Sequence, residues 1–121
     1  MRLFALRGAI SVERNDAADI HAATITLMRE IMQRNDLRPQ DVVSCIFTVT
    51  SDLDAEFPAA AARELGFAAV PLLCAQEIAV PGAMPRVIRV MLHYHAPEGH
   101  SATHVYLGDA RALREDLAAA Q

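Results

Sequence analysis

Hydrophobic and polar positions along the chain predict short strands and two helices. Residues 2 to 7 predict a strand that Gly8 ends. Asn15-Asp16 then offers a helix N-cap, because a short polar side chain there can accept from the first free backbone N–H groups. Apolar side chains recur at helical spacing after this cap, which predicts a helix to about Asn35, on positions Ile20, Thr24, Leu27 and Ile31.

The rest of the chain predicts mainly strands. Residues 42 to 50 are dense in β-branched side chains, which favours a central strand covered on both faces. Pro58 is suited to the first position of a short helix, and Gly66 to its left-handed end. Three more strands are expected; they span residues 68 to 74, at an edge or a bulge because of Pro71, then 86 to 95, and then 103 to 107.

Length and composition favour one small domain over residues 1–121 that gains burial by oligomerising. The chain has 121 residues, and 53% of them are hydrophobic but only 5% aromatic, so Ala, Val, Leu and Ile must build most of the core. A net charge of -4 argues against binding of nucleic acid, which needs clustered positive charge.

The sequence also favours a reduced, cytoplasmic protein. Its two cysteines, Cys45 and Cys74, stand alone in apolar surroundings. No apolar run approaches the roughly 18 residues that span a bilayer, which argues against a membrane partner. The first seven residues become charged too soon for a secretory signal. We therefore expect the cytoplasm as the location.

Arg89 is the most informative polar residue. Strand alternation puts it on one face with Val87 and Met91, while the opposite face is apolar. We expect Arg89 to be half buried, where a guanidinium is costly unless an anion meets it. That anion is either a protein carboxylate or a ligand. For this strand taken alone, an internal ion pair or a surface arginine whose charge reaches solvent is favoured over a ligand.

Other candidates stand at the ends of expected strands. Glu77 follows an apolar strand directly, and Arg7 precedes a glycine that permits close approach. Tyr106 alternates with apolar neighbours, which suits either a cavity or a core position. Arg63 and Arg114 are weaker candidates, since arginines on a short helix or in a tail are usually solvated.

Metal and thiol chemistry find little support. His93, His95 and His104 could meet on neighbouring strands, but no third ligand stands at a diagnostic spacing. Cys74 has no evident histidine in sequence to activate it as a nucleophile. We therefore expect no metal site and no thiol enzyme.

The order of several segments resembles the AroH-class chorismate mutases, which are monofunctional trimeric α/β enzymes. The similarity covers about residues 3 to 117, and its motifs are specific only together. The matching segments are Leu6-Arg7-Gly8-Ala9-Ile10-Ser11-Val12-Glu13, Phe57-Pro58-Ala59, Ala62-Arg63, Val70 to Glu77, Arg86 to Met91, and His104-Val105-Tyr106-Leu107.

This resemblance implies an α+β fold, with a mixed β-sheet, helices packed on one side and a homotrimeric pseudo-barrel. It implies rearrangement of chorismate to prephenate in interfacial clefts, without a cofactor, for phenylalanine and tyrosine biosynthesis. Arg89, Glu77 and Arg7 would be catalytic. The substrate-binding set would be Arg7, Leu73, Cys74, Ala75, Gln76, Glu77, Arg89 and Tyr106, with Phe57 and Arg63 from a neighbouring subunit and Arg114 in a mobile tail from about residue 111.

Three positions depart from the family pattern. Ala60 stands where some members carry a charge, Leu73 where some carry threonine, and Glu115 where proline is common. The first two bear on affinity, and the third on closure by Arg114. Two alternatives remain at this point: a trimeric imine or enamine deaminase, and a non-catalytic trimer that binds an aromatic-pathway acid.

Overall fold

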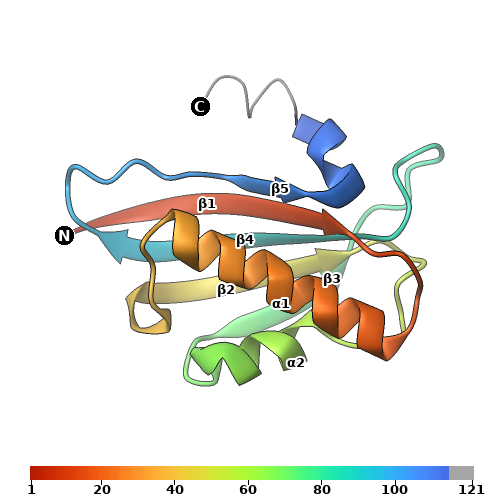
Figure 1. Ribbon diagram of the computed structural model, residues 1–121, viewed down its shortest axis with the longest axis horizontal. Helices are drawn as coiled ribbons and strands as arrows, with labels where there is room; N and C mark the ends of the chain where they lie inside the picture. Colours follow the sequence, from red (N-terminus) through yellow and green to blue (C-terminus); the bar gives the residue numbers. More distant parts are fainter. Residues whose placement is uncertain (115–121) are drawn as a thin grey trace.

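One mixed β-sheet organises the computed structural model, which describes residues 1–114 of the chain (Figure 1). Its strand order is β3-β2-β4-β1-β5. β4 runs antiparallel to both of its neighbours, whereas β1 pairs with β5, and β2 with β3, in parallel. The elements are β1 (Arg2–Ser11), α1 (Ala17–Arg34), η1 (Pro39–Asp41), β2 (Val42–Val49), α2 (Pro58–Ala62), η2 (Arg63–Phe67), β3 (Leu72–Gln76), β4 (Val87–Ala96), β5 (Val105–Leu107) and η3 (Gly108–Arg114).

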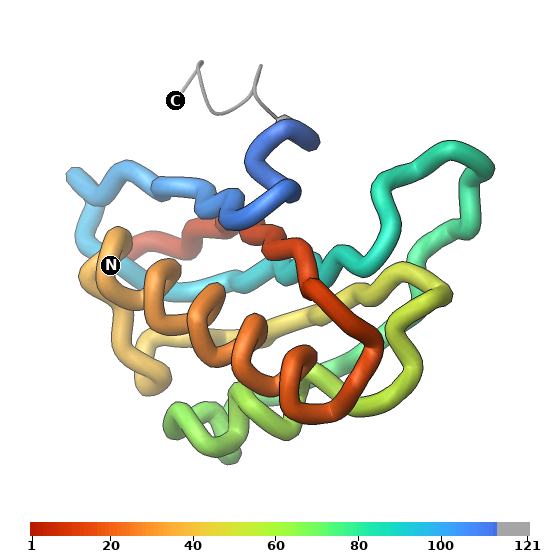
Figure 2. The backbone as a smooth tube through the Cα atoms, turned by 45° about the vertical axis from the view of Figure 1, so that its right-hand side comes forward, coloured from red at the N-terminus to blue at the C-terminus, as the bar shows by residue number. Residues whose placement is uncertain are grey.

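Helices α1 and α2 cover one face of the sheet (Figures 1 and 2). The Asp16 side chain caps α1 by accepting from the Asp19 N–H at 2.7 Å, as the sequence predicts. The buried stripe of α1 matches the expected helical spacing and packs into the main core; it consists of Ile20, Thr24, Leu27, Met28 and Ile31. The α+β fold with helices on one side is therefore confirmed.

Gly8 lies inside β1 and does not end it, so that prediction was wrong. The strand continues to Ser11. A Cβ at Gly8 would lie 2.8 Å from Ile31 Cδ1 and 3.3 Å from the Val105 carbonyl oxygen. Glycine is therefore needed here for the close approach of α1 and β5 to β1, and not for a turn.

The face of the sheet away from the helices, which we call the open face, is partly uncovered. Strand register places Arg7, Met91, Ile46 and Leu73 in one row across it. Ile46 and Met91 are exposed, and Leu73 is 61% exposed. The strand expected at 42 to 50 is interior, because β2 pairs with β3 on one side and β4 on the other. The expectation that it is covered on both faces was wrong for a single chain, since Ile46 on the open face is exposed.

The C-terminal part of the described chain closes one corner of the open face. η3 packs Ala110 against Ala9 and Val87, and the Asp109 N–H donates to Ser11 Oγ at 2.8 Å. Residues 111–114 thus belong to a 3-10 helix, and the rest of the tail that we expected to be mobile lies outside the described residues. Among residues 1–114, none of the helices has the length and apolar character that a membrane span requires.

Candidate active site

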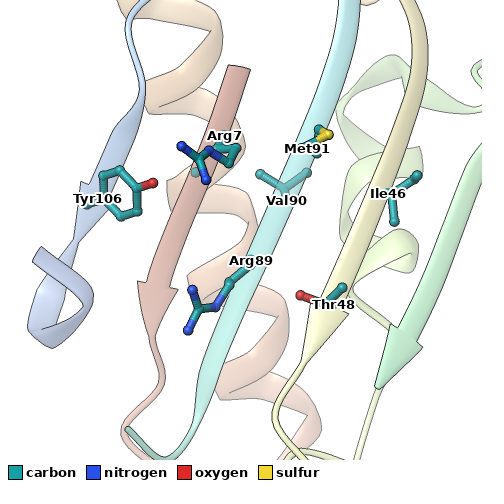
Figure 3. Close-up of a pocket in the computed structure, with 8 residues that line it drawn as sticks. Arg7, Ile46, Thr48, Arg89, Val90, Met91 and Tyr106 are labelled. Carbon is teal, nitrogen blue, oxygen red and sulfur yellow. The ribbon is translucent and has the colours of Figure 1, made fainter. Parts of the chain in front are cut away.

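A cavity of about 310 Å³ lies on the open face and brings four strands together (Figure 3). We call it the Arg89 cavity. Its volume suits a small molecule. Three charged or polar candidates from the sequence line it, one each from β1, β4 and β5. The full lining is Arg7, Gly8, Ile46, Thr48, Arg89, Val90, Met91 and Tyr106.

Strand register explains why these side chains share a cavity. Arg89 lies opposite Ala9 on β1 and opposite Thr48 on β2, and Ala9 also pairs with Tyr106 on β5. Residues that are directly opposite in a sheet point to the same face. Because Ala9 is small, it leaves space between the Tyr106 ring and the Arg89 guanidinium.

Arg89 forms an ion pair with Glu77, which does not line the Arg89 cavity itself but, together with Arg89, lines an adjoining cavity of about 180 Å³. Arg89 Nε lies 3.0 Å from Glu77 Oε2, and the two side chains are 41% and 18% exposed. Although the distance is short, the Nε–H bond is not aligned with any acceptor among the described residues, so the contact is one of charge and not a well-formed hydrogen bond. The expected half burial of Arg89 is confirmed, and its anion within the chain is a protein carboxylate.

The backbone around Glu77 and Arg7 is held by specific hydrogen bonds. The Glu77 N–H donates to the Val49 carbonyl at 2.9 Å, which continues the β2–β3 ladder one residue past β3. The Arg7 N–H donates to His104 Nδ1 at 2.9 Å, just before β5 begins to pair with β1. Both charged side chains therefore project from fixed positions.

Positive charge dominates the Arg89 cavity. Arg7 and Arg89 line it, and no carboxylate is among its lining residues; the carboxylate of Glu77 contacts Arg89 from the adjoining cavity. The Tyr106 hydroxyl points toward the Arg7 side chain (Figure 3). Such an arrangement suits an anionic ligand, because a partly enclosed site weakens the competition from water for these charges.

Cys74 and Phe57 lie together in a second cavity of about 350 Å³. Cys74 pairs with Phe47 in the sheet and so faces the helix side, opposite to the Arg89 cavity. Phe57 is 68% exposed just before α2. Ala75 and Gln76 also line this second cavity. Within one chain the structure therefore does not bring Cys74, Gln76 or Phe57 to Arg89.

The remaining candidates lie apart from both cavities. Arg63 is exposed at the start of η2, and Leu73 is exposed on the open face beside Ile46. The backbone of Arg114 ends η3, but its side chain lies outside the described residues.

Sequence reasoning missed Thr48, Ile46 and Met91 as lining residues. Alternation within residues 42 to 50 puts Ile46 and Thr48 on one face, which was a usable signal. Their position beside Arg89 depends on the register between β2 and β4, which alternation alone does not give.

Comparison with known proteins decides between the functions that this site allows. The family model described as chorismate mutase type I matches residues 3–117. The protein named chorismate mutase AroH from Thermus thermophilus is 44% identical over 118 residues, covering 96% of this chain and 97% of that protein. The protein of the same name from Bacillus subtilis (strain 168) is 40% identical over 119 residues, covering 97% and 94%.

The chain belongs to the type I chorismate mutases. A solved structure agrees with this at the level of the fold. A chorismate mutase from Clostridium thermocellum superimposes with a TM-score of 0.86 at 44% identity, covering 90% of this chain and 98% of that one.

Membership of the chorismate mutase family makes this protein an isomerase of aromatic amino acid biosynthesis. It supports the mutase prediction and not the imine or enamine deaminase or the non-catalytic binder. The recognition from sequence motifs is therefore confirmed, as is the fold class.

Proposed function

We propose that this enzyme rearranges chorismate to prephenate in the Arg89 cavity, and that Arg89, Glu77 and Arg7 are the catalytic groups. One observation carries the proposal: Arg89, which lines a cavity together with Arg7, has a guanidinium nitrogen 3.0 Å from the carboxylate of Glu77. Chorismate carries two carboxylates, and its rearrangement separates charge as the ether C–O bond breaks ahead of C–C formation. A site with fixed opposite charges is suited to that transition state.

Arg89 is the donor to the ether oxygen. Negative charge develops on this oxygen as the C–O bond breaks, and the terminal nitrogens of Arg89 project into the cavity (Figure 3). Because the strand fixes the guanidinium before the reaction begins, little reorganisation is needed when the charge appears.

Glu77 faces the other half of the separating charge. Its carboxylate accepts from the ring hydroxyl of chorismate and stabilises the positive charge that develops on the ring. Arg7 and Tyr106 bind one substrate carboxylate, since the Tyr106 hydroxyl points toward Arg7. Together these contacts confine the substrate to its reactive conformer, which lowers the entropic part of the barrier.

A homotrimer completes the site in this proposal. The open face carries exposed apolar side chains beside the Arg89 cavity, and Phe57 is exposed beside Cys74 in the second cavity. When a neighbouring copy places its second cavity against the Arg89 cavity, both apolar surfaces are covered. Phe57, Cys74, Ala75 and Gln76 of the neighbouring copy, which line its second cavity, then border the substrate together with Leu73 and Arg63, and Arg114 closes over it. The resemblance placed only Phe57 and Arg63 on the neighbour; Cys74 and Gln76 are assigned to it here because they lie away from Arg89 within one chain.

The remaining expectations belong to the same proposal. The enzyme acts in the cytoplasm, without a nucleic-acid or membrane partner. The reaction is pericyclic and breaks no bond that calls for a metal, a nucleophile or a redox group. Turnover is therefore expected to be unchanged after treatment with a chelator.

The test is to incubate the purified protein with chorismate and to follow the loss of its absorbance while NMR identifies the product. Prephenate that forms faster than in buffer alone supports the proposal. Chorismate that persists at the uncatalysed rate, with the protein folded, would refute it.

A further inference from the structure

One cavity residue has no part in the roles given above: Thr48. It lies on β2, half buried, opposite Arg89 on β4 and Ala75 on β3. Its Oγ1 donates a hydrogen bond of 2.8 Å to Glu77 Oε2. This oxygen is the same one that lies 3.0 Å from Arg89 Nε. One carboxylate oxygen is therefore shared by a hydroxyl and a guanidinium.

We propose that Thr48 is a positioning residue, which holds the Glu77 carboxylate so that it meets Arg89 at Nε. The inference rests on the proposed function of the Arg89 cavity. Thr48 itself touches no reacting atom. It affects turnover by orienting Glu77, and the orientation of Glu77 determines which nitrogen of Arg89 the carboxylate contacts.

Glu77 needs such a restraint because of where it stands. Its backbone is fixed by the N–H bond to Val49, but it lies one residue beyond the end of β3, and its long side chain has several rotamers. A β-branched threonine on a strand has a restricted χ1, so its hydroxyl is a stiff anchor. The anchor and the ion pair act on the same oxygen from two strands.

The alternative geometry explains why the restraint matters. An arginine and a carboxylate that are free to turn prefer a two-point contact, in which both carboxylate oxygens accept from the guanidinium. Starting from the Nε contact, the second carboxylate oxygen would engage a terminal nitrogen of Arg89, which the reaction needs for the ether oxygen. With Oε2 held by Thr48, Glu77 meets Arg89 at Nε and leaves the terminal nitrogens to the substrate.

The experiment compares Thr48→Val, which keeps the shape but removes the donor, with Thr48→Ser, which keeps the donor. In Thr48→Val we expect kcat to fall by about ten- to a hundred-fold, the range for losing a hydrogen bond to a charged group, while KM changes little. Thr48→Ser recovers most of kcat. Thr48→Ala serves in place of valine if that variant does not fold.

Ser44→Ala is the matched control. Ser44 lies on the same strand and face, and its hydroxyl contacts His93 Nδ1 across to β4 at 3.4 Å, but it does not line the Arg89 cavity. It should keep the kcat of the parent. A loss in Ser44→Ala equal to that in Thr48→Val would mean that any hydroxyl on β2 has the same effect, and would overturn the proposal.

A second readout separates positioning from a general structural role. Calorimetry measures the Kd of a stable dicarboxylate mimic of the transition state for Thr48→Val, Glu77→Ala and the double variant. Because Thr48 acts through Glu77, its loss should weaken binding in the parent and have no further effect in Glu77→Ala. Equal losses in both backgrounds would contradict the inference.

The activity of the parent enzyme separates failure of the proposed function from failure of the proposed role of Thr48. If the parent does not convert chorismate, the proposed function fails. If the parent is active and folded Thr48→Val matches it in kcat, the proposed function stands and the role of Thr48 is refuted.

Discussion

At the scale of single residues, the ion pair of Arg89 and Glu77 bears on both stability and the proposed reaction. An arginine on a strand that packs against a core loses hydration, and Glu77 offsets part of that loss. The pair is partly exposed in one chain, so its contribution to stability is small there. In the proposed reaction its larger effect is on turnover, because the two opposite charges are already in place when the substrate separates charge.

The first prediction concerns Arg89. If it donates to the ether oxygen, its contact strengthens in the transition state, so Arg89→Ala should lower kcat more than it raises KM. Removing one such donor costs about 3 to 4 kcal/mol, or roughly a hundred- to a thousand-fold in rate. Arg89→Lys should not restore the rate, because lysine keeps the charge but loses the planar donor geometry.

Steady-state kinetics beside melting temperatures test this prediction. A purely structural Arg89 would lower the melting temperature and leave turnover near that of the parent. Folded variants with kcat within about threefold of the parent would contradict the assignment.

A second residue-scale prediction concerns Cys45, which is 1% exposed below the sheet. Burial raises the pKa of its thiol to about 12, and the nearby Cys74 adds to the rise. In the unfolded chain a thiol titrates near about 8.5. The stabilising contribution of the neutral thiol is therefore complete below that pH and is lost as the pH rises toward 12.

Urea unfolding between pH 8 and pH 11 measures this effect. The free energy of unfolding should fall with a slope that approaches about 1.4 kcal/mol per pH unit from this group. Burial also raises the pKa of Tyr94, which adds in the same direction. The chain contains no lysine to titrate in this range. Cys45→Ala should show a shallower slope, and parallel curves would contradict the prediction.

At the scale of elements, sequence patterns placed α1, α2 and four of the strands close to where the structure has them. The strand expected at 68 to 74 begins only at Leu72, because the chain still turns after η2, where the Val70 N–H donates to the Phe67 carbonyl. Asp16 and Pro58 each gave a helix start through their own chemistry. Gly8 was misread because glycine serves both turns and close packing, and only the position of α1 over β1 shows which one applies. Local sequence carries no information on that contact.

Some residues of the candidate site could be predicted from the sequence, and others could not. Arg7, Arg89 and Tyr106 were identified from strand position and family resemblance, and the structure brings them into one cavity. Thr48 was missed because its contact with Glu77 depends on the register of β2 with β3 and β4. Register is a property of paired strands. Alternation within one strand tells which face of the sheet a side chain occupies, but not which residue lies beside it on the next strand.

The element-scale prediction follows from the packing of α1 on β1. Gly8→Ala places a Cβ 2.8 Å from Ile31 Cδ1 and 3.3 Å from the Val105 oxygen. The methyl of Ile31 can shift, but the carbonyl belongs to a paired strand, so we expect a loss of about 1–3 kcal/mol in unfolding free energy.

Gly99→Ala is the control, because nothing lies within 4 Å of a Cβ there. Urea denaturation of both variants should show a clear loss for Gly8→Ala and little change for Gly99→Ala. A Gly8→Ala protein as stable as the parent would show that α1 and β5 move apart at little cost.

At the scale of the whole molecule, the open face is an apolar surface that a single chain leaves uncovered. It carries exposed Ile46, Leu73 and Met91 beside the Arg89 cavity, and Phe57 is exposed at the second cavity. Apolar surface of this kind marks an interface. Closed threefold symmetry would bury each copy's second cavity against the next copy's Arg89 cavity, and would do so three times without an open end.

Light scattering coupled to size exclusion tests this arrangement, and we expect the mass of three chains at micromolar concentration. Ile46→Glu should shift the mass toward that of one chain and lower activity with it, because a buried charge opposes the interface. Val43→Glu is the control for adding a charge to an exposed apolar position of β2. Val43 lies on the same strand at a register irregularity and does not line the Arg89 cavity. A parent protein that is monomeric and fully active would refute the shared site.

The most direct test of the central claim is a crystal structure with a stable dicarboxylate mimic of the transition state. We expect the mimic in the Arg89 cavity, with its ether oxygen within hydrogen-bonding distance of a terminal nitrogen of Arg89 and a carboxylate at Arg7 and Tyr106. Phe57 of a second copy should lie beside it. A mimic bound at another cavity, or bound here without any contact to Arg89, would contradict the account.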